Sequence, residues 1–429
     1  MTEHFIFSGH DTTDLAARFG TPLYVFSEDI FLERAQSLKD AFNKTGADYE
    51  INFAGKSFLN MAVCRLVEKA GISLDTASGG ELFTALSAGF NPAKITLHGN
   101  NKTEKELKEA LEAGAGRIVV DSADELERLD RLTRETGINA RILFRINPGV
   151  DAHTNELINT GKTDTKFGIP LEDARELILT TREMPGVETI GLHAHIGSQV
   201  TDEECFVAEA DIMSGLYSEL LTEGLPLCEL NLGGGFGIAY RPGDASFDPA
   251  TYIPRMVERI RKIFQLKGIE MPRLMIEPGR FLSAEAGITH YTVGTRKNIR
   301  GVRTYVTVDG GMADNPRPAL YGAEYDAVIC NREMTPENSR AVRVSGNACE
   351  TDTLISDIKL ADPRPGDLLA VRHTGAYNYT MASNYNRLPR PAVVLLSGER
   401  SDIIVERETY EDLIAQDRIP DWLEQQKKD

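Results

Sequence analysis

The chain has 429 residues, of which 41% are hydrophobic and 26% charged, a composition typical of a soluble globular protein too long for one ordinary core. Its formal net charge of −18 argues against nucleic acid or an anionic membrane as the main partner. We expect a cytoplasmic protein with reduced thiols. The N-terminus shows no secretory signal, no apolar run approaches the roughly 20 residues of a membrane span, and the five cysteines have no metal-ligand spacing.

Short β-rich runs alternate with amphipathic helical segments from about residue 48 to residue 280. The predicted strands are Tyr49–Ala54, Ile72–Thr76, Ile95–Gly99, Arg117–Asp121, Ala140–Asn147, Thr189–His195, Leu227–Leu232 and Leu274–Glu277. The predicted helices between them include Gly79–Ala88, Thr103–Glu112 and Ser122–Thr136. Thr103 followed by Glu106 is the signature of a capping box. Eight strands alternating with helices predict an α/β fold, a (β/α)₈ TIM-like barrel over residues 34–278.

The pattern changes after Arg280. Later segments are β-rich, with glycine and proline between them and little helical periodicity: Tyr305–Asp309, Ala341–Ser345, Asp367–Arg372 and Ala392–Leu396. The early run Pro22–Phe26 has the same character and precedes the barrel. We therefore predict a C-terminal all-β domain, of β-sandwich or β-barrel type, that takes in the N-terminal segment and comprises residues 1–33 and 279–429.

The unusual polar residues of the barrel segment share one position, at or just past the C-terminal end of a predicted strand. They are Lys56, Asp75, His98, Asp121, Arg145, His195, Gly233 and Glu277. Barrel enzymes build their active sites on that face. A random scatter of polar residues would not segregate in this way, so the positions together indicate an active site.

Three of these positions carry chemistry that fits one cofactor. A half-buried lysine such as Lys56 can lose its proton and form an imine with an aldehyde. The glycine run Gly233–Gly237 can bring backbone N–H groups to a phosphate, and Glu277 can hold a pyridinium nitrogen protonated. Each feature alone is ordinary, since strand-end lysines, glycine turns and ion-paired carboxylates are common. Together they predict a site for pyridoxal phosphate (PLP).

His193 and His195 alternate, so on a regular strand they point to opposite faces. We expect His195 to face the barrel mouth and the cofactor, and His193 to face the helix layer. A metal role would need further ligands at suitable spacing, and the sequence shows none, so no metal is expected.

The motifs in their order resemble the PLP-dependent group IV decarboxylases, which share the fold of alanine racemase, and among these the diaminopimelate decarboxylase family. The resemblance covers nearly the whole chain. The motifs that carry it are Phe53–Lys56, Asn147–His153, Thr165–Gly168, His195–Gln199, Gly233–Gly237, Glu277–Arg280, Asp309–Met312, Asn315–Tyr321, Cys349–Glu350 and Gly375–Tyr377. It implies decarboxylation of meso-2,6-diaminopimelate to L-lysine and CO₂, an EC 4.1.1.20 activity of lysine biosynthesis.

The resemblance also implies the roles of individual residues. Lys56 would hold PLP and Cys349 would protonate the carbanion, making these two the catalytic residues. The implied cofactor-binding residues are Lys56, Asp75, His195, Ser198, Gly234, Gly235, Glu277, Gly279, Arg280 and Tyr377. The implied substrate-binding residues are Arg280, Arg317, Tyr321, Glu350 and Tyr377. The family further implies a homodimer in which Cys349 and Glu350 complete the active site of the other subunit.

Two alternatives stay open. The chain departs from the family after Glu350, where Thr351–Thr353 replaces the usual Ser-x-Asp, so a sister decarboxylase acting on ornithine, arginine, carboxynorspermidine or a D-configured diamino acid is the nearest rival. A non-catalytic regulatory homologue is the rival of another class, although Lys56, Cys349 and Glu277 are all kept. Alanine racemase is disfavoured, because Glu277 would make the cofactor ring too strong an electron sink for simple racemisation.

Overall fold

The computed structural model describes residues 4–151 and 165–424, so the last two residues of the motif Asn147–His153 lie outside the described residues. The chain divides into two compact units. The first, the barrel unit, comprises Ser27–Gly287 together with Arg372–Thr380. The second, the sheet-rich unit, comprises Met1–Phe26, Ile288–Val371 and Met381–Asp429. None of the described helices is both long and apolar enough to cross a membrane.

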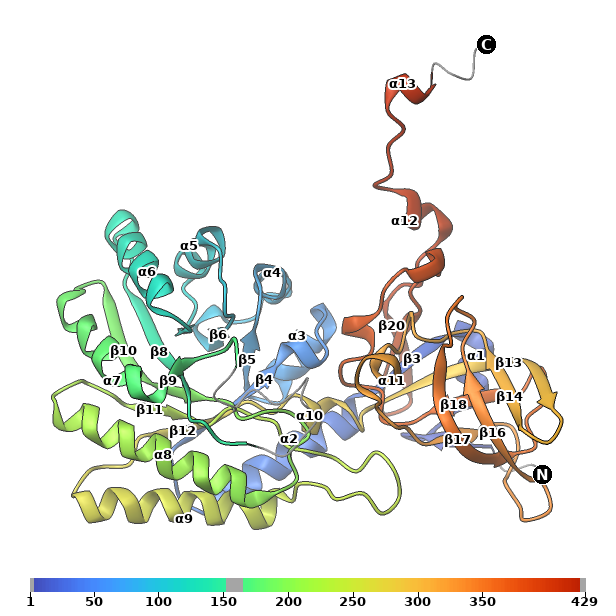
Figure 1. Cartoon of the computed structure of the whole chain (residues 1–429), viewed down its shortest axis with the longest axis horizontal. Coiled ribbons are helices and arrows are strands. Elements are labelled where there is room, and N and C mark those ends of the chain that lie inside the picture. Colours follow the sequence, from blue (N-terminus) through green and yellow to red (C-terminus); the bar gives the residue numbers. More distant parts are fainter. Residues whose placement is uncertain (1–3, 152–164, 425–429) are drawn as a thin grey trace. The chain divides into compact units, whose positions relative to one another are not determined.

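Eight parallel strands of the described chain close into the predicted barrel (Figure 1). In the order in which they pair, they are β4 (Tyr49–Ala54), β5 (Ser73–Thr76), β6 (Ile95–Leu97), β7 (Arg117–Val120), β8 (Ala140–Asn147), β10 (Val187–Ala194), β11 (Glu229–Asn231) and β12 (Arg273–Ile276). Pairing of β12 with β4 closes the ring, and the short β9 (Ile169–Pro170) pairs with the end of β8. Because every strand is parallel, all their C-terminal ends meet at one end of the barrel.

Helices of the barrel unit lie outside the ring of strands (Figure 1). They are α2 (Glu28–Asn43), α3 (Met61–Lys69), α4 (Gly79–Ser87), α5 (Glu104–Ala113), α6 (Ala123–Thr136), α7 (Leu171–Thr180), α8 (Glu203–Thr222), α9 (Pro249–Lys267) and the short α10 (Arg280–Ser283). Most begin in the same way, with a side-chain oxygen that accepts a backbone N–H of the first turn. These N-cap residues are Ser27, Asn60, Ser78, Thr103, Ser122, Asp202 and Asp248. The predicted capping box of Thr103 and Glu106 is confirmed.

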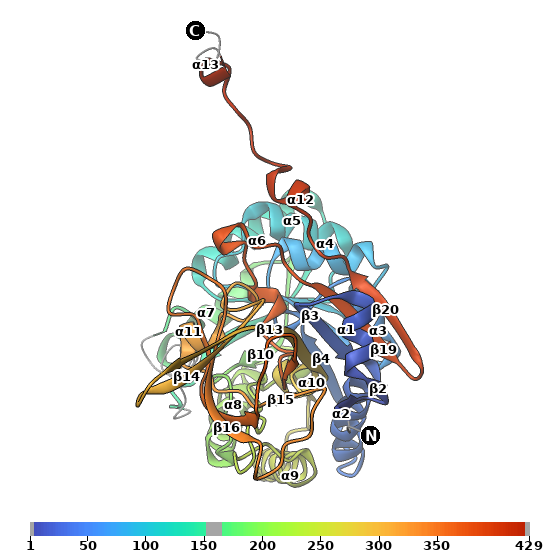
Figure 2. The same cartoon turned by 90° about the vertical axis from the view of Figure 1, so that its right-hand side faces the viewer.

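The sheet-rich unit is built on one long sheet with strand order β17-β16-β14-β13-β3-β19-β20. Strand β18 pairs with β13, and β15 pairs with β18. Figure 2 shows β14, β13, β3, β19 and β20 of this unit. Its strands are β1 (Ile6–Phe7), β2 (His10–Asp11), β3 (Leu23–Ser27), β13 (Gly287–Ile299), β14 (Arg303–Val308), β15 (Ala327–Ile329), β16 (Ser339–Ser345), β17 (Thr353–Ala361), β18 (Leu368–Val371), β19 (Ala392–Ser397) and β20 (Arg400–Val405). Short helices accompany them: α1 (Thr12–Phe19), α11 (Arg317–Tyr321), α12 (Tyr410–Ile414) and α13 (Asp421–Glu424). The N-terminal strand β3 lies within this sheet, as predicted.

The predicted barrel comprises residues 34–278, whereas the barrel segment of the structure extends from Ser27 to Gly287. Helix α2 contacts α9 and α10, so it belongs with the barrel from its first residue. The N–H of Ser27 donates to the carbonyl of Ala286 at 2.7 Å, which joins the two ends of the barrel segment. The segment Arg372–Thr380 also packs with the barrel, because Gly287 and Gly375 approach so closely that a Cβ on Gly287 would lie 2.3 Å from the Cα of Gly375. Sequence periodicity cannot detect such a return of the chain.

Candidate active site

Polar side chains converge on Glu277, which follows the last barrel strand, β12. His98 follows β6 and His193 lies in β10; these strands are not neighbours of β12 in the sheet. The Nε2 atom of His98 lies 2.9 Å from Oε1 of Glu277, and the Nε2 atom of His193 lies 3.0 Å from Oε2. Asn231 adds a third contact, its amide donating to Oε1 at 2.7 Å. Contacts between non-adjacent strands cross the barrel interior, so this cluster fills the core at the C-terminal end.

The electrostatics of the cluster leave Glu277 ionised. Burial opposes ionisation, yet the electrostatic interactions with His98 and His193, and the hydrogen bonds from them, hold the pKa of Glu277 well below its usual range. Burial lowers the pKa of His193 to about 4, so this ring is neutral at pH 7. Because an ionised carboxylate only accepts hydrogen bonds, each histidine carries its proton on Nε2. The cluster is therefore one buried negative charge that accepts hydrogen bonds from His98, His193 and Asn231.

A second acid borders the cluster. Asp75, the third residue of β5, is buried, and its Oδ1 lies 3.9 Å from Nε2 of His98. Burial raises the pKa of Asp75, and the negative charge of Glu277 adds to the rise. Two buried carboxyl groups close together with pKa values shifted in opposite directions are typical of a functional site. The sequence placed both at strand ends, and the structure brings them together.

The predicted orientation of His193 is wrong, and the reason is local. Strand β10 ends at Ala194, so only His193 lies within the regular alternation, and it points into the barrel toward Glu277. His195 lies beyond the strand, where its Nδ1 accepts the backbone N–H of Gly234 at 3.2 Å. Burial, with the positive charge of Lys56 adding to it, lowers the pKa of His195 well below 6.5.

Lys56 lies in a single 3₁₀ turn, Gly55–Ser57, directly after β4. We expected a half-buried lysine, but its side chain is exposed, because the residue projects from the turn beyond the end of the strand. The backbone beneath it is fixed: the carbonyl of Ser57 accepts the N–H of Tyr377 at 2.8 Å. A Cβ on Gly55 would lie 2.8 Å from the carbonyl of Asp75, so only glycine fits before Lys56. The turn thus presents the Lys56 side chain where its charge acts on both Asp75 and His195.

The glycine run forms a close-fitting turn after β11. A Cβ on Gly234 would lie 2.0 Å from the carbonyl of Glu277, and one on Gly235 would lie 2.1 Å from that of Gly197. Gly235 also has a φ of +97°, which side chains rarely adopt. Asn231 ties this turn to the carboxylate, since its Oδ1 accepts the N–H of Gly233 at 2.9 Å. The glycines therefore let the backbone approach the Glu277 segment closely.

Arg280 provides positive charge beside this turn. Although buried, it donates to Ser198 Oγ at 2.8 Å and to the Tyr240 hydroxyl at 2.5 Å, and its guanidinium carbon lies 5.0 Å from the ring centroid of Tyr377. Its Nε is buried with no hydrogen-bond partner among the described residues. A buried cation with a spare donor, a serine hydroxyl and a glycine turn are the parts that recognise a phosphate.

The remaining predicted residues belong to the sheet-rich unit. Arg317, at the start of α11, is buried and donates to the Tyr325 hydroxyl at 2.5 Å, while Tyr321 ends the same helix. Cys349 and Glu350 are exposed in the loop between β16 and β17. The N–H of Cys349 donates to Asn386 Oδ1 at 2.8 Å, and Glu350 accepts from the Tyr385 hydroxyl at 2.6 Å. These four residues lie in a different unit from Lys56 and Glu277.

Asp352 explains how the loop after Cys349 keeps its shape despite departing from the family pattern. Its carboxylate accepts the N–H of Met312 at 2.7 Å and that of Ala348 at 2.9 Å. A Cβ on Gly346 or on Gly311 would lie 2.2 Å from Oδ2 of this carboxylate. Asp352 therefore packs directly against Gly311 and Gly346. The departure from the family pattern at Thr351–Thr353 keeps this aspartate and both glycines.

Sequence reasoning missed several partners of the predicted residues. His98 was noticed only as a strand-end residue, and Asn231 only as part of a strand before the glycines. Both donate to Glu277, and Tyr240 accepts from Arg280. A histidine at a strand end and an asparagine inside a buried strand were the available signals, since buried polar groups need partners. Which partner each one has depends on contacts across the barrel.

The ligand atoms of His98, His193 and Glu277 lie within 4.8 Å of one another, a spacing that a metal ion can bridge. The contacts of 2.9 and 3.0 Å between histidine nitrogens and carboxylate oxygens are hydrogen bonds, which need a proton on each Nε2. These atoms therefore satisfy one another directly.

Comparisons with known proteins agree with one another. Residues 29–284 match the family model described as pyridoxal-dependent decarboxylase, pyridoxal binding domain. The diaminopimelate decarboxylase of Bacillus subtilis (strain 168) is 44% identical over 421 residues, covering 96% of this chain and 95% of that protein. The crystal structure of diaminopimelate decarboxylase from M. jannaschii with L-lysine superposes with a TM-score of 0.92 at 37% identity, covering 98% of this chain and 97% of the other. That from Helicobacter pylori with L-lysine gives a TM-score of 0.86 at 30% identity, covering 97% and 99%.

The family model matches more than half of the chain and nearly all of the segment Ser27–Gly287, and the curated relative spans both units. Identity at this level over almost the full length of both proteins is far above what a shared barrel fold alone would give. The chain belongs to the pyridoxal-dependent decarboxylases, within the diaminopimelate decarboxylase family.

Proposed function

We propose that this chain catalyses the PLP-dependent decarboxylation of meso-2,6-diaminopimelate, releasing CO₂ and L-lysine, in the cytoplasm. The observation that carries the proposal is the ionised, buried Glu277 at the end of the barrel that also presents Lys56 and Arg280. Relatives named for this activity, two of them solved with L-lysine, support the choice of substrate.

The residues present fit the cofactor. Arg280, whose buried Nε lacks a partner, would hold the phosphate together with Ser198 and the backbone of Gly234, Gly235 and Gly279. Glu277 would accept a hydrogen bond from the protonated ring nitrogen, His195 would stack on the ring, and Asp75 and Tyr377 would complete the contacts. When bound, PLP supplies an aldehyde that takes up an amino group and a pyridinium ring that accepts an electron pair.

The chain's own residues then have defined tasks. The Lys56 amine would hold the cofactor until the substrate amine replaces it. The Glu277 carboxylate would keep the ring nitrogen protonated, so that the ring can accept the electron pair released with CO₂. After the C–C bond to CO₂ has broken, Cys349 would deliver a proton from its Sγ to Cα, and a C–H bond replaces the C–C bond.

The distal end of the substrate carries a second amine and a second carboxylate. Arg280, Arg317 and Tyr321 would bind that carboxylate, and Glu350 would bind the distal amine. Arg317 is buried, and a substrate without the distal carboxylate would leave its charge without that partner. This requirement favours diaminopimelate over ornithine.

We further propose that the active enzyme is a homodimer in which Cys349 and Glu350 act in the active site of the other subunit. Both residues are exposed on a loop of the sheet-rich unit, which suits a contact with a second chain.

Lys56→Ala tests the central assignment. The variant should lose the absorbance band of the lysine-bound cofactor, and CO₂ release should fall by at least about a thousandfold, because the amine that binds the cofactor is gone. Borohydride reduction of the wild-type holoenzyme should leave a pyridoxyl adduct on Lys56, detected by peptide mass spectrometry. Lys105→Ala, which removes a lysine whose side chain is 82% exposed on α5, is the matched control and should behave as wild type. Turnover by Lys56→Ala at the wild-type rate would contradict the assignment.

A substrate panel separates the proposed function from its rivals. Diaminopimelate, ornithine, arginine, carboxynorspermidine and D-configured diamino acids should be assayed for CO₂ release, with products identified by mass spectrometry. We expect release from diaminopimelate alone, with L-lysine as product. Activity confined to another member of the panel would identify a sister decarboxylase, and no activity with any member would identify the non-catalytic homologue.

A further inference from the structure

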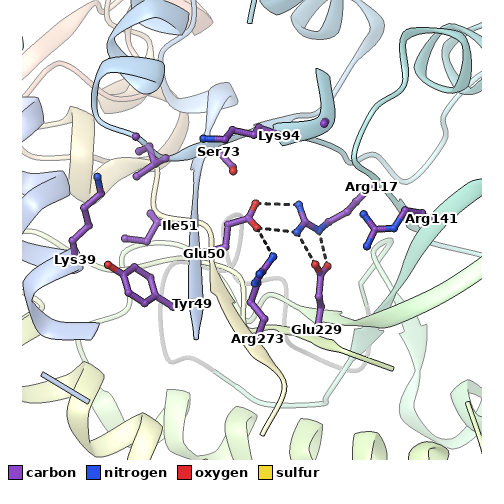
Figure 3. A pocket seen from close by; sticks show the side chains of 13 residues that line it. Lys39, Tyr49, Glu50, Ile51, Ser73, Lys94, Arg117, Arg141, Glu229 and Arg273 are labelled. Carbon is purple, nitrogen blue, oxygen red and sulfur yellow. Dashed lines mark hydrogen bonds and ion pairs between the residues drawn. The ribbon is translucent and has the colours of Figure 1, made fainter. Parts of the chain in front are cut away.

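A cavity of about 500 Å³, shown in Figure 3, is lined by residues at the N-terminal ends of barrel strands, whereas Glu277 follows the C-terminal end of β12. It is lined by the first residues of five strands: Tyr49, Ser73, Arg117, Glu229 and Arg273. The N-terminal ends of the strands form this face, whereas barrel active sites occupy the C-terminal ends.

The arginine side of the cavity is electrically balanced. Buried Arg117 binds Glu229 at 2.6 Å and Glu50 at 2.8 Å, and Arg273 lies 3.6 Å from Glu50 and 3.1 Å from Asp48. Figure 3 shows Glu50 between the two guanidinium groups. Every charge in this network has a partner of opposite sign, so the network stabilises the barrel floor. Arg141 also lines the cavity, and its Nε lies 3.7 Å from Oε2 of Glu188.

The lysine side of the cavity is not balanced. Lys39 of α2 and Lys94, which precedes β6, both line the cavity, and neither forms an ion pair with a carboxylate of the described residues. Lys39 Nζ donates to the carbonyl of Ala70, and the absence of a side chain at Gly71 lets it approach, since a Cβ there would lie 3.3 Å from Nζ. Burial lowers the pKa of Lys39, and the charge of Lys94 lowers it further. Two like charges therefore face one cavity within a chain of net charge −18.

A serine that is itself largely buried lines the same cavity as these two amines. Ser73, the first residue of β5, is 3% exposed and offers a hydroxyl group. In Figure 3 its side chain lies between Lys94 and Glu50 and points into the cavity. A hydroxyl and two ammonium groups together offer several donors and no negative charge.

We propose that this cavity is an anion-binding site that takes a small dianion of phosphate or dicarboxylate type between Lys39, Lys94 and Ser73. A dianion would neutralise both ammonium groups and accept the serine hydroxyl, which relieves the repulsion between the two lysines. Ile51 and Ile72 also line the cavity and offer no partner for a charge, so the anion would lie at the end formed by the two lysines. The inference does not rest on the proposed function, because the two sites lie at opposite ends of the barrel.

The rival reading is that Lys39 only caps the C-terminus of α3 and that Lys94 is a solvated surface lysine. The two readings differ in one measurable respect: only an anion site needs both lysines at once. The probe is inorganic phosphate, titrated calorimetrically into the holoenzyme at constant ionic strength. In the holoenzyme, the phosphate of bound PLP occupies the phosphate-binding residues at the catalytic end. The heat of added phosphate therefore reports on the cavity.

Saturable phosphate binding is expected for the wild type, and Lys94→Ala should weaken it by about tenfold or more, because one of the two charge-assisted contacts is lost. Lys39→Met should do the same, although it also removes the cap on α3, so Lys94→Ala is the deciding variant. Lys105→Ala, which removes a similarly exposed lysine elsewhere, should bind phosphate as the wild type does. Succinate in place of phosphate tells a dicarboxylate site from a phosphate site.

Equal phosphate affinity in the wild type and in Lys94→Ala would overturn the proposal, as would the absence of saturable heat with both phosphate and succinate. Lys94 is exposed and is the last residue of the short 3₁₀ turn Pro92–Lys94, so its replacement should leave folding intact. Retained PLP absorbance in each variant would verify this. Neither result would bear on decarboxylation, which is measured separately with the substrate panel.

Discussion

At the scale of the residue, Glu277 is the best-defined group in the molecule. Isolated buried carboxylates ordinarily take up a proton, because desolvation disfavours the charged form. Three donors, from His98, His193 and Asn231, reverse that preference here. Both histidines are buried, so the cluster cannot relax into water and the charge stays at one place. The arrangement prepares a negative charge for a group with a protonated nitrogen.

Replacing this carboxylate by its neutral amide tests that argument. Glu277→Gln keeps the size of the side chain but removes the charge, so decarboxylation should fall by about a hundredfold or more while the cofactor still binds. The kcat for diaminopimelate and the cofactor absorbance measure the two effects separately. Asp244→Asn, an exposed surface carboxylate converted in the same way, is the control. A wild-type kcat in Glu277→Gln would mean that the charge has no catalytic role.

The buried carboxyl group of Asp314 should make the free energy of unfolding depend on pH. Burial raises its pKa to about 7, although it accepts hydrogen bonds from Tyr291 and from the N–H of Gly311. Between pH 7 and the unfolded value of 3.8 the folded protein holds this proton and the unfolded chain does not, so acidification adds stability. Relative to Asp314→Asn, the wild type should gain about 1.4 kcal/mol per pH unit as the pH falls from 7 toward 4. Urea unfolding of both proteins at several pH values measures the difference, and parallel curves would refute it.

At the scale of the element, the helices around the barrel begin at side chains that accept backbone N–H groups. Glu106 does this for two helices at once. Its carboxylate accepts the N–H of Thr103 at 2.8 Å, in the capping box of α5, and the N–H of Gly79 at 2.8 Å, at the start of α4. A Cβ on Gly79 would lie 2.9 Å from Cγ of Glu106, so a glycine is needed there. One carboxylate thereby links the first turns of two successive helices of the barrel, α4 and α5.

This coupling predicts an order of stabilities. Thr103→Ala removes one capping oxygen and should cost about 1 kcal/mol, whereas Glu106→Ala leaves two backbone N–H groups without their acceptor and should cost about 2 kcal/mol. The mid-points of urea unfolding, with unchanged slopes, measure both values. Lys108→Ala, on an exposed position of the same helix, should be close to neutral. An equal cost for the two capping variants would show that Glu106 acts on α5 alone.

At the scale of the whole molecule, the implied catalytic groups are divided between two compact units. Lys56, Glu277 and Arg280 belong to the barrel unit, and Cys349 and Glu350 belong to the sheet-rich unit. Neither unit by itself holds both the proposed cofactor amine and the proposed proton donor. A dimer with shared sites supplies both from different subunits.

Mixing two inactive variants tests this arrangement. Lys56→Ala and Cys349→Ala should each be inactive alone, yet an equal mixture allowed to exchange subunits should regain about a quarter of wild-type activity, because half of the dimers are mixed and each has one intact site. The recovered kcat after dilution and reassociation is the measurement. Mixing Lys56→Ala with Glu277→Gln, which lie in the same unit, is the control and should regain nothing above the residual rates. No recovery in the first mixture would place Cys349 and Lys56 in the site of one subunit.

The sequence by itself determined the barrel, because strand and helix periods are local properties and the strand-end positions of Asp75, His195 and Glu277 follow from them. It also determined the family, through motifs that extend across both units. Tertiary structure alone decided that His193 points into the barrel, that His98 and Asn231 hold Glu277, that Lys56 is exposed and that Arg372–Thr380 returns to the barrel. These facts depend on which distant segments meet and on where a strand ends, and a hydrogen bond between strands far apart in the sheet has no signature in local spacing.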